Sequence, residues 1–391
     1  MKRGAVILPG ATLGVLGGGQ LGRMFVHAAQ QMGYFTVVLD PDANSPAGRV
    51  SHQHLVADYS DPQALAQLGG LCAAVTTEFE NVPAASLAAL AEQSRVVSPA
   101  AASVSVAQDR AREKAHFVAC GVPCAPYAVL DNETSLAQIQ QDLLPGILKT
   151  ARMGYDGKGQ VRVKTREALA AAWAQLGQVP CVLEKMLPLA LECSVIVARG
   201  RDGDMVNFPV QRNLHRDGIL AVTEVFEDPE PHLSHQTAQQ AVASARAIAQ
   251  GLDYVGVLCV EFFVLQDGRL VVNEIAPRPH NSGHYTLDGC DVSQFELQVR
   301  TLCGLPLTSP RLHSASIMLN LLGDLWPQDG LATNPPWEKV LALPGTHLHL
   351  YGKQEAKPGR KMGHLNITAE TAARARRVAL EAAACLGMAA F

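Results

Sequence analysis

The stretch Lys149-Thr-Ala-Arg-Met-Gly-Tyr-Asp-Gly-Lys-Gly-Gln160 is the most informative part of this chain. The apolar run that ends at Lys149 predicts a short buried strand, and residues 161–163 predict the strand that follows the loop. Glycines let backbone amides approach phosphate oxygens, and Arg152 and Lys158 offset phosphate charge. The loop is therefore a candidate for folding over polyphosphate, although a mobile basic hairpin would have the same composition.

A hairpin that carries two carboxylates follows further along the chain. Residues 255–264 and 270–275 predict strands joined by the turn residues Asp267-Gly268. A two-residue turn there places Glu261 directly opposite Glu274 on one face of an apolar sheet. Like charges in that position are destabilising unless a cation, a shared proton or exposure to solvent relieves them. The apolar surroundings favour Mg²⁺, which commonly binds one or two carboxylates together with phosphate and water.

The segment Ala276-Pro-Arg-Pro-His-Asn-Ser-Gly-His284 comes directly after the second glutamate. So many hydrogen-bond donors beside a metal suggest a loop that binds oxyanions. No ligand spacing in this segment predicts zinc.

The N-terminal part of the chain predicts a strand–helix–strand unit. We interpret residues 1–11 as a dispensable extension ahead of a buried strand at 13–16 and the loop Gly17-Gly-Gly-Gln-Leu-Gly22. Helix and strand patterns follow at 20–32 and 35–39. This is a GxGxxG loop in the context of a dinucleotide site, and its amides would suit any phosphate. NAD and the phosphate of a mononucleotide both remain open as ligands.

Further alternation of strands and helices extends this unit to about residue 105 and predicts a small doubly wound parallel sheet. Ligands bind at the carboxyl edge of such sheets. Glu78 follows the strand predicted at 73–76, so it could contact a substrate hydroxyl or amine, or be a solvated acid. Arg110, near the start of a helix predicted at 109–120, could reach a phosphate or be exposed.

The last part of the chain predicts strands at 316–321, 347–351 and 364–367, with a closing helix after Thr368. Cations lie beside glycines between these strands, where they form either an anion site or a solvated basic turn: Lys353, Arg360 and Lys361.

Composition limits the classes of function. The chain has 391 residues, of which 48% are hydrophobic and 17% charged, so it can bury two or three cores. A net charge of −4 without a long basic run gives no case for nucleic acid. No apolar span reaches membrane length, and no secretory leader is evident. The nine cysteines have no CxxC spacing, so we expect reduced thiols in a cytoplasmic protein.

Several motifs together resemble the 5-(carboxyamino)imidazole ribonucleotide synthases of the ATP-grasp superfamily. They span nearly the whole chain in the family's order: Gly17-Gly-Gly-Gln-Leu-Gly-Arg-Met24, Gly154-Tyr-Asp-Gly-Lys-Gly-Gln160, Asn213-Leu-His-Arg-Asp-Gly-Ile219, Asn273-Glu-Ile-Ala-Pro-Arg278, His280-Asn-Ser-Gly-His284 and Pro358-Gly-Arg-Lys-Met-Gly-His-Leu-Asn366. Walker A and protein-kinase signatures are absent from the sequence.

The resemblance implies an α/β fold in three parts. These are an N-terminal doubly wound parallel sheet of the pre-ATP-grasp type (residues 1–105), a central α+β ATP-grasp domain (106–305) and a small β-rich C-terminal domain (306–391).

The resemblance also implies an activity. ATP would activate bicarbonate as carboxyphosphate, and the exocyclic amine of 5-aminoimidazole ribonucleotide would be carboxylated, in purine biosynthesis. The expected cofactors are ATP and Mg²⁺, and the expected assembly is a homodimer. Two alternatives remain: an ATP-grasp ligase for another acid, and a non-catalytic protein that senses NAD through Gly17–Gly22 and Asp40.

Each matching position receives a role from the resemblance. ATP is expected to contact Arg110, Lys149, Gly154, Tyr155, Asp156, Gly157, Lys158, Gly159, Gln160, Glu184, Lys185, Met186, Leu187, Glu192, His215, Asn273 and Glu274. The metal ligands would be Glu261 and Glu274, and the catalytic residues Arg278, His280, Asn281 and Lys149. The ribonucleotide would contact Gly18, Gly19, Gln20, Glu78, Tyr155, Asp156, Lys353, Arg360 and Lys361. The N-terminal glycine loop then holds the phosphate of the ribonucleotide rather than NAD.

Replacing Gly157 and Gly159 with alanine is expected to raise the KM for ATP, because alanine stiffens a loop that must close over the nucleotide. Steady-state kinetics with varied ATP measures this effect. A KM equal to that of the wild type would show that the loop does not close on the nucleotide.

Overall fold

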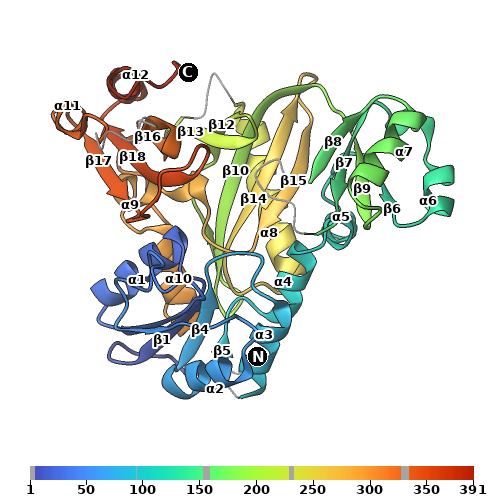
Figure 1. Cartoon of the computed structure of the whole chain (residues 1–391). Helices are drawn as coiled ribbons and strands as arrows, with labels where there is room; N and C mark the ends of the chain where they lie inside the picture. Colours follow the sequence, from blue (N-terminus) through green and yellow to red (C-terminus); the bar gives the residue numbers. More distant parts are fainter. Residues whose placement is uncertain (1–4, 94, 153–158, 229–232, 327–333) are drawn as a thin grey trace.

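A computed structural model of the chain describes residues 5–93, 95–152, 159–228, 233–326 and 334–391 (Figure 1). Within these residues the strands form sheets of five, nine and four strands. The five-stranded sheet belongs to the N-terminal part (blue in Figure 1), and the four-stranded sheet stands at the opposite end (green). The nine-stranded sheet lies between them.

The N-terminal sheet is parallel throughout and has the order β3-β2-β1-β4-β5. Its elements are β1 (Thr12–Leu16), α1 (Gln20–Gln31), β2 (Phe35–Leu39), β3 (Gln53–Leu55), α2 (Pro62–Leu71), β4 (Ala74–Thr77), α3 (Ala84–Glu92) and β5 (Val96–Val97). The predicted doubly wound sheet is confirmed. The chain order reverses between β1 and β4, so the loops after these two strands lie side by side.

The segment before β1 is not a dispensable extension in its described part. The amide of Ile7 donates to the carbonyl of Cys303 at 2.9 Å, and the carbonyl of Ile7 accepts from the Tyr34 hydroxyl at 2.8 Å. Cys303 ends α10 (Gln294–Cys303), which packs against α1. This segment therefore helps to fasten the N-terminal sheet to the central region.

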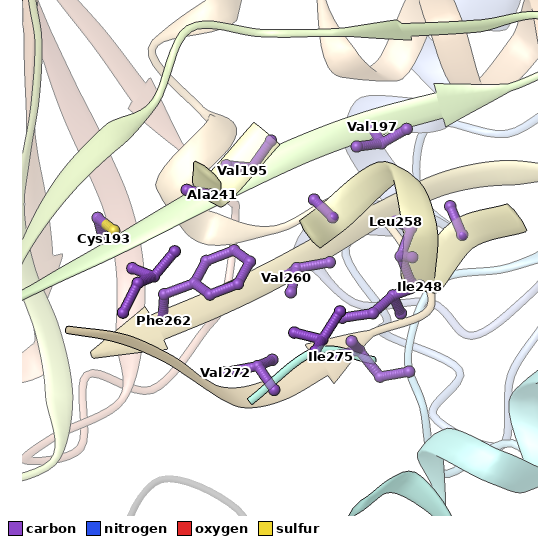
Figure 2. Close-up of a cluster of buried hydrophobic side chains, with 14 of the residues drawn as sticks. Cys193, Val195, Val197, Ala241, Ile248, Leu258, Val260, Phe262, Val272 and Ile275 are labelled. Carbon is purple, nitrogen blue, oxygen red and sulfur yellow. The ribbon is translucent and has the colours of Figure 1, made fainter. Parts of the chain in front are cut away.

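The central sheet contains the hairpin predicted from the sequence, and a layer of helices covers one face of this sheet. Its strands are β10 (Leu189–Arg199), β11 (Met205–Asn207), β12 (Gln211–Arg216), β13 (Ile219–Val225), β14 (Gly256–Leu265) and β15 (Leu270–Ala276). The helices α4 (Ala101–Ala107), α5 (Arg110–Ala119) and α8 (His235–Gly251) contribute to the covering layer. Val260 and Phe262 of β14 point into a buried cluster with Ala241 and Ile248 of α8 (Figure 2).

The four-stranded sheet has the order β6-β9-β7-β8 and is antiparallel. Its elements are β6 (Tyr127–Leu130), α6 (Glu133–Gln138), β7 (Gly146–Thr150), β8 (Gln160–Val163), α7 (Arg166–Gln175) and β9 (Cys181–Lys185). The cationic glycine loop joins β7 to β8, as predicted. Its residues 153–158 lie outside the described part of the chain.

The C-terminal region is β-rich, as expected, but its strands continue the central sheet. Strand β13 pairs with β16, and the order goes on through β18 to β17. The elements are α9 (Thr286–Gly289), β16 (Ala315–Leu322), α11 (Trp337–Leu341), β17 (Thr346–Leu350), β18 (Lys361–Ala369) and α12 (Ala372–Cys385). The domain limits at residues 105 and 305 stay predictions.

Among the helices that the structure describes, none combines the length and the apolar character needed to span a lipid bilayer.

Replacing Phe262 with alanine is expected to lower the free energy of unfolding by about 3–5 kcal/mol, because it opens a cavity in the packed cluster of Figure 2. Phe35 is the matched control, since 51% of its surface is exposed, against 1% for Phe262. Its replacement by alanine should cost less than about 1 kcal/mol in urea denaturation. Equal losses in the two variants would contradict this placement of the core.

Candidate active site

The two glutamates of the hairpin lie opposite each other, as predicted. Glu261 of β14 pairs in register with Glu274 of β15. The turn differs from the prediction, because Leu265 hydrogen-bonds with Arg269 across a three-residue connection that ends at Gly268, whose φ is +85°. A bulge at Asn273 adds one residue to β15 and restores the pairing of the glutamates.

Each glutamate has its own cationic partner. The Oε1 atom of Glu261 lies 2.9 Å from Nε2 of His280, and the Oε2 atom of Glu274 lies 3.2 Å from a guanidinium nitrogen of Arg110. Burial alone would raise the pKa of Glu261, but the positive charges of His280 and His215 lower it to about 2. The Glu261 side chain is therefore mostly buried and ionised, whereas 40% of the Glu274 side-chain surface stays exposed.

The bulge leaves a polar atom without a partner. The Oδ1 atom of Asn273 is buried, and no hydrogen bond in the structure satisfies it. An unpartnered buried acceptor costs about 1–3 kcal/mol, so the position suits a ligand that supplies a donor or a cation. Two carboxylates and an amide oxygen on neighbouring positions of one hairpin fit the oxygen preference of Mg²⁺.

Helix α5 supports the hairpin from the side. Asp109 caps its N-terminus, which places Arg110 in the first turn against Glu274. One turn later the buried Glu113 accepts a hydrogen bond from the amide of Ile275 at 2.8 Å. Burial and the nearby Glu274 raise the pKa of Glu113 to about 8, although Lys114 and Arg110 lower it in part.

A buried chain of charges joins α5 to the four-stranded sheet. Glu184 of β9 lies between Lys149 of β7 at 3.0 Å and Lys114 of α5 at 3.1 Å. Burial disfavours the charged form of Glu184, but Lys149 and Lys114 lower its pKa overall. Lys114 was absent from the predicted site. Its position four residues after Arg110, on the same helix face, was the available signal.

The segment after Glu184 forms the connection between the two sheets. The amide of Lys185 donates to Pro126 at 2.9 Å, and that of Met186 donates to Pro145 at 3.0 Å. Leu187 is half-buried and the Met186 side chain is exposed.

Glu192 and His215 meet on the neighbouring strands β10 and β12. The Oε2 atom of Glu192 contacts Nδ1 of His215. Burial lowers the pKa of His215, but Glu192 and Glu261 raise it overall. The His215 side chain therefore lies near Glu261, although β10 separates β12 from β14.

The loop after β15 is tied to the N-terminal sheet. Nε of Arg278 contacts Oε2 of Glu80, a residue that the sequence analysis did not single out as a site residue. Burial would raise the pKa of Glu80, but Arg278 lowers it to about 2. The sequence around either residue does not predict this ion pair, because Arg278 follows β15 of the central sheet and Glu80 follows β4 of the N-terminal sheet.

His280 and Asn281 follow Arg278 in this loop. Burial alone would lower the pKa of His280, but Cys259 and Glu261 raise it to about 10. The side chain of Asn281 is buried, and neither its Oδ1 nor its Nδ2 atom has a hydrogen-bond partner. The loop therefore presents a cation beside Glu261 and, at the next residue, an unsatisfied amide.

The GxGxxG loop is occupied by carboxylates of the protein itself. The amide of Gly18 donates to Oδ2 of Asp40 at 2.6 Å. The amides of Gly19 and Gly22 donate to the carboxylate of Glu78 at 2.9 and 3.1 Å. Glu78 is buried, so the solvated alternative for it is wrong. The expectation that the amides of Gly18 and Gly19 bind a phosphate disagrees with this arrangement, because a phosphate would meet two carboxylates there.

The basic segment of the C-terminal region lies beside the start of α1. Tyr351 packs against Leu21 and Met24 of that helix. Lys353 donates to the carbonyl of Lys361 at 2.8 Å. Arg360 donates to the carbonyl of Glu355 at 3.0 Å, and all three basic side chains are half-buried. Gln20 is the first residue of α1 and directly precedes Leu21.

Part of the predicted site lies outside the described residues: Gly154, Tyr155, Asp156, Gly157 and Lys158. The flanking Gly159 has a φ of +72°, and Gln160 pairs in register with Lys149. The described end of the loop therefore returns to the strand that carries Lys149.

The raised pKa of Glu113 predicts a pH dependence of stability. Between its ordinary pKa of 4.5 and about 8 the folded state holds one proton more than the unfolded state, so stability falls as the pH rises through this window. Glu113→Gln should flatten this part of the profile, since its amide oxygen can still accept from Ile275. Urea denaturation between pH 5 and 9 measures it. Glu381→Gln, on the exposed face of α12, is the control and should follow the wild type. A Glu113→Gln profile that also followed the wild type would contradict the raised pKa.

Sequence profiles of three families match successive parts of the chain. The ribonucleotide synthetase preATP-grasp domain matches residues 10–108, and the ATP-grasp domain matches 115–295. The phosphoribosylaminoimidazole carboxylase C-terminal domain matches residues 316–378.

Relatives match over almost the whole chain. The N5-carboxyaminoimidazole ribonucleotide synthase of Brucella melitensis is 44% identical over 363 residues, which are 91% of this chain and 96% of the relative. That of Bacillus subtilis is 40% identical, over 93% of this chain and 92% of the relative. Both relatives carry the same name.

Solved structures agree with the fold. The Aspergillus clavatus N5-carboxyaminoimidazole synthase in complex with ADP and 5-aminoimidazole ribonucleotide has a TM-score of 0.87 at 32% identity, covering 96% of this chain and 98% of that chain. The Staphylococcus aureus enzyme complexed with ADP has a TM-score of 0.88 at 36% identity, covering 98% and 99%. The chain thus belongs to the N5-carboxyaminoimidazole ribonucleotide synthase family, the ATP-dependent ligases that carboxylate aminoimidazole ribonucleotide in purine biosynthesis.

Proposed function

We propose that this ligase uses bicarbonate as the acid and that Glu261 and Glu274 hold Mg²⁺ together with the phosphates of ATP. One observation carries the proposal: the two carboxylates are paired in register beside the unpartnered buried oxygen of Asn273. When bound, Mg²⁺ would offset the negative charge of the phosphate oxygens during phosphoryl transfer. The other parts of the site are assigned around this hairpin.

The nucleotide lies between the hairpin and the four-stranded sheet in this proposal. Arg110 and Lys149 contact the phosphates, since each is a cation held in place by a carboxylate that also faces the site. The loop of residues 154–160 closes over them. The segment Glu184 to Leu187 lines the adenine pocket with backbone groups, and Glu192 binds the ribose hydroxyls near His215. Lys114 acts through Glu184 as a positioning residue.

Bicarbonate attacks the terminal phosphate of ATP to give carboxyphosphate and ADP. Arg278 and His280 supply positive charge for the carboxyphosphate oxygens, and the unsatisfied Nδ2 atom of Asn281 can donate a hydrogen bond to them. The interaction of Arg278 with Glu80 fixes the direction of the guanidinium. A closed loop excludes water, which would hydrolyse carboxyphosphate. No covalent nucleophile of the protein is required.

The ribonucleotide lies between the N-terminal sheet and the C-terminal basic segment. Because the carboxylates of Asp40 and Glu78 take the amides of the glycine loop, the phosphate is assigned to Lys353, Arg360 and Lys361. Glu78 then faces the imidazole amine or a ribose hydroxyl. Tyr155 and Asp156 keep their assignment from the family motif alone. A homodimer and a cytoplasmic location are likewise supported by the family alone.

The release of ADP in the presence of Mg²⁺ and bicarbonate, with and without 5-aminoimidazole ribonucleotide, tests the substrate assignment. The ribonucleotide should stimulate ADP release, and the carboxylated product should form in equal amount. Stimulation by an amino acid or formate in place of bicarbonate would instead support another ATP-grasp ligase.

Replacing Glu274 with glutamine should reduce kcat by at least about 100-fold, because the site loses a negative charge that would hold Mg²⁺. Without the ion, less of the charge that develops on the phosphate oxygens during phosphoryl transfer is offset. Coupled measurement of ADP release gives the rate. Glu370→Gln is the matched control, since Glu370 also pairs with an arginine, Arg374, but lies next to α12 in the C-terminal region. It should retain the activity of the wild type. Near-normal turnover of Glu274→Gln would refute the metal role of this residue.

A further inference from the structure

A second set of metal-binding side chains lies next to Glu261. Cys259 precedes Glu261 by two residues on β14, so both side chains point to the same face, opposite to Val260, which points into the cluster of Figure 2. His280 reaches the same place from the loop after β15. One ligand atom from each of Cys259, Glu261 and His280 lies within 4.8 Å of the other two.

We propose that Cys259, Glu261 and His280 form a binding site for a thiophilic divalent cation such as Zn²⁺, separate in its donor set from the Mg²⁺ site. Sulfur and imidazole nitrogen select zinc and its chemical relatives, whereas Mg²⁺ prefers oxygen ligands. A thiolate and a carboxylate together balance the charge of the ion. Three protein ligands leave a fourth tetrahedral position for water.

The three ligands are held by rigid elements. Strand β14 is paired on both sides, with Ile196 of β10 and Ala276 of β15 opposite Cys259. The backbone of His280 is fixed by the side chain of Gln294, which accepts from its amide at 2.9 Å and donates to its carbonyl at 2.8 Å. Zinc bonds to nitrogen and sulfur of about 2.0–2.3 Å place tetrahedral ligand atoms roughly 3.5 Å apart. A side-chain movement of about 1 Å therefore completes the site.

The burial of the three ligands determines how the cation reaches the site. Cys259 is fully buried, while 13% of the side-chain surface of Glu261 and of His280 remains exposed. The cation therefore enters past the carboxylate and the imidazole and reaches the sulfur last. Arg278, the nearby cation, has its charge offset by Glu80.

Occupation of this site blocks the ligase. The ion takes Glu261 from the Mg²⁺–nucleotide site and His280 from the carboxyphosphate site. This inhibitory consequence rests on the proposed function, whereas the binding of the ion does not. Turnover should therefore be inhibited by Zn²⁺ and restored by a chelator.

Titration of the metal-free protein with Co²⁺ tests the binding without any substrate. A cobalt–thiolate bond gives a charge-transfer absorption in the near ultraviolet, which should saturate at one equivalent. Cys259→Ala should lose this absorption and weaken Co²⁺ binding beyond the roughly 10–100-fold effect of an outer-shell change. Cys259→Ser, which keeps the side-chain volume closer, guards against a packing defect, and both variants are checked by their unfolding midpoints.

Cys120→Ala is the matched control. The Sγ atom of Cys120 lies 3.3 Å from Nε2 of His116 on α5, so this variant removes another cysteine–histidine pair, one that is not part of a three-ligand group among the described residues. It should keep the full absorption. No absorption in the wild type, its persistence in both Cys259 variants, or its loss in Cys120→Ala would overturn the proposal.

Enzyme kinetics then tests the metal site separately from the proposed ligase function. The wild type should be inhibited by Zn²⁺ at concentrations that leave Cys259→Ala at its own zinc-free rate. Equal inhibition of the two proteins would overturn the proposal. The predicted cobalt absorption in a protein that shows no ribonucleotide-dependent ADP release would refute the proposed function and leave the metal site standing.

Discussion

The pairing of Glu261 with Glu274 across β14 and β15 is the constraint on which the rest of the site depends. Like charges at opposite positions of a hairpin are destabilising, and the fold gives each carboxylate a cationic partner from a different direction. Arg110 comes from the first turn of α5, and His280 comes from the loop after β15. The bulge at Asn273 brings the glutamates into register and leaves a free acceptor beside them. The hairpin is thus balanced, yet open to a further cation.

Ion pairs between sheets link this hairpin to the other parts of the molecule. The contact of Arg278 with Glu80 joins it to the N-terminal sheet, and the hydrogen bond from Gln298 to Thr76 at 3.2 Å reinforces the same junction. On the other side, Lys114 and Lys149 hold Glu184 between α5 and the four-stranded sheet. Buried pairs of this kind add little net stability but penalise any arrangement that separates them. They therefore fix the relative positions of groups that must act on one substrate.

The sequence predicted the periodic elements well, because alternation of apolar residues and turn signals is local information. The opposition of the glutamates was predicted correctly from a wrong turn, since the bulge at Asn273 cancelled the extra loop residue. Strand β12 was missed because Gln211–Arg216 is polar where it meets Glu192. Glu80 and Lys114 were missed because their partners are distant in sequence. The glycine loop was interpreted as an anion site, and only the fold shows that Glu78 already occupies its amides.

The binding of Mn²⁺–ADP, followed by the paramagnetic signal of the free ion, tests the central role of the hairpin most directly. Mn²⁺ stands in for Mg²⁺ at oxygen ligands. Glu261→Gln and Glu274→Gln should each weaken the binding of Mn²⁺–ADP by at least about tenfold, because each removes one ligand charge. The affinity for ADP in the presence of a chelator should stay unchanged. If both variants bound Mn²⁺–ADP as tightly as the wild type, the two glutamates would not be ligands of the metal ion.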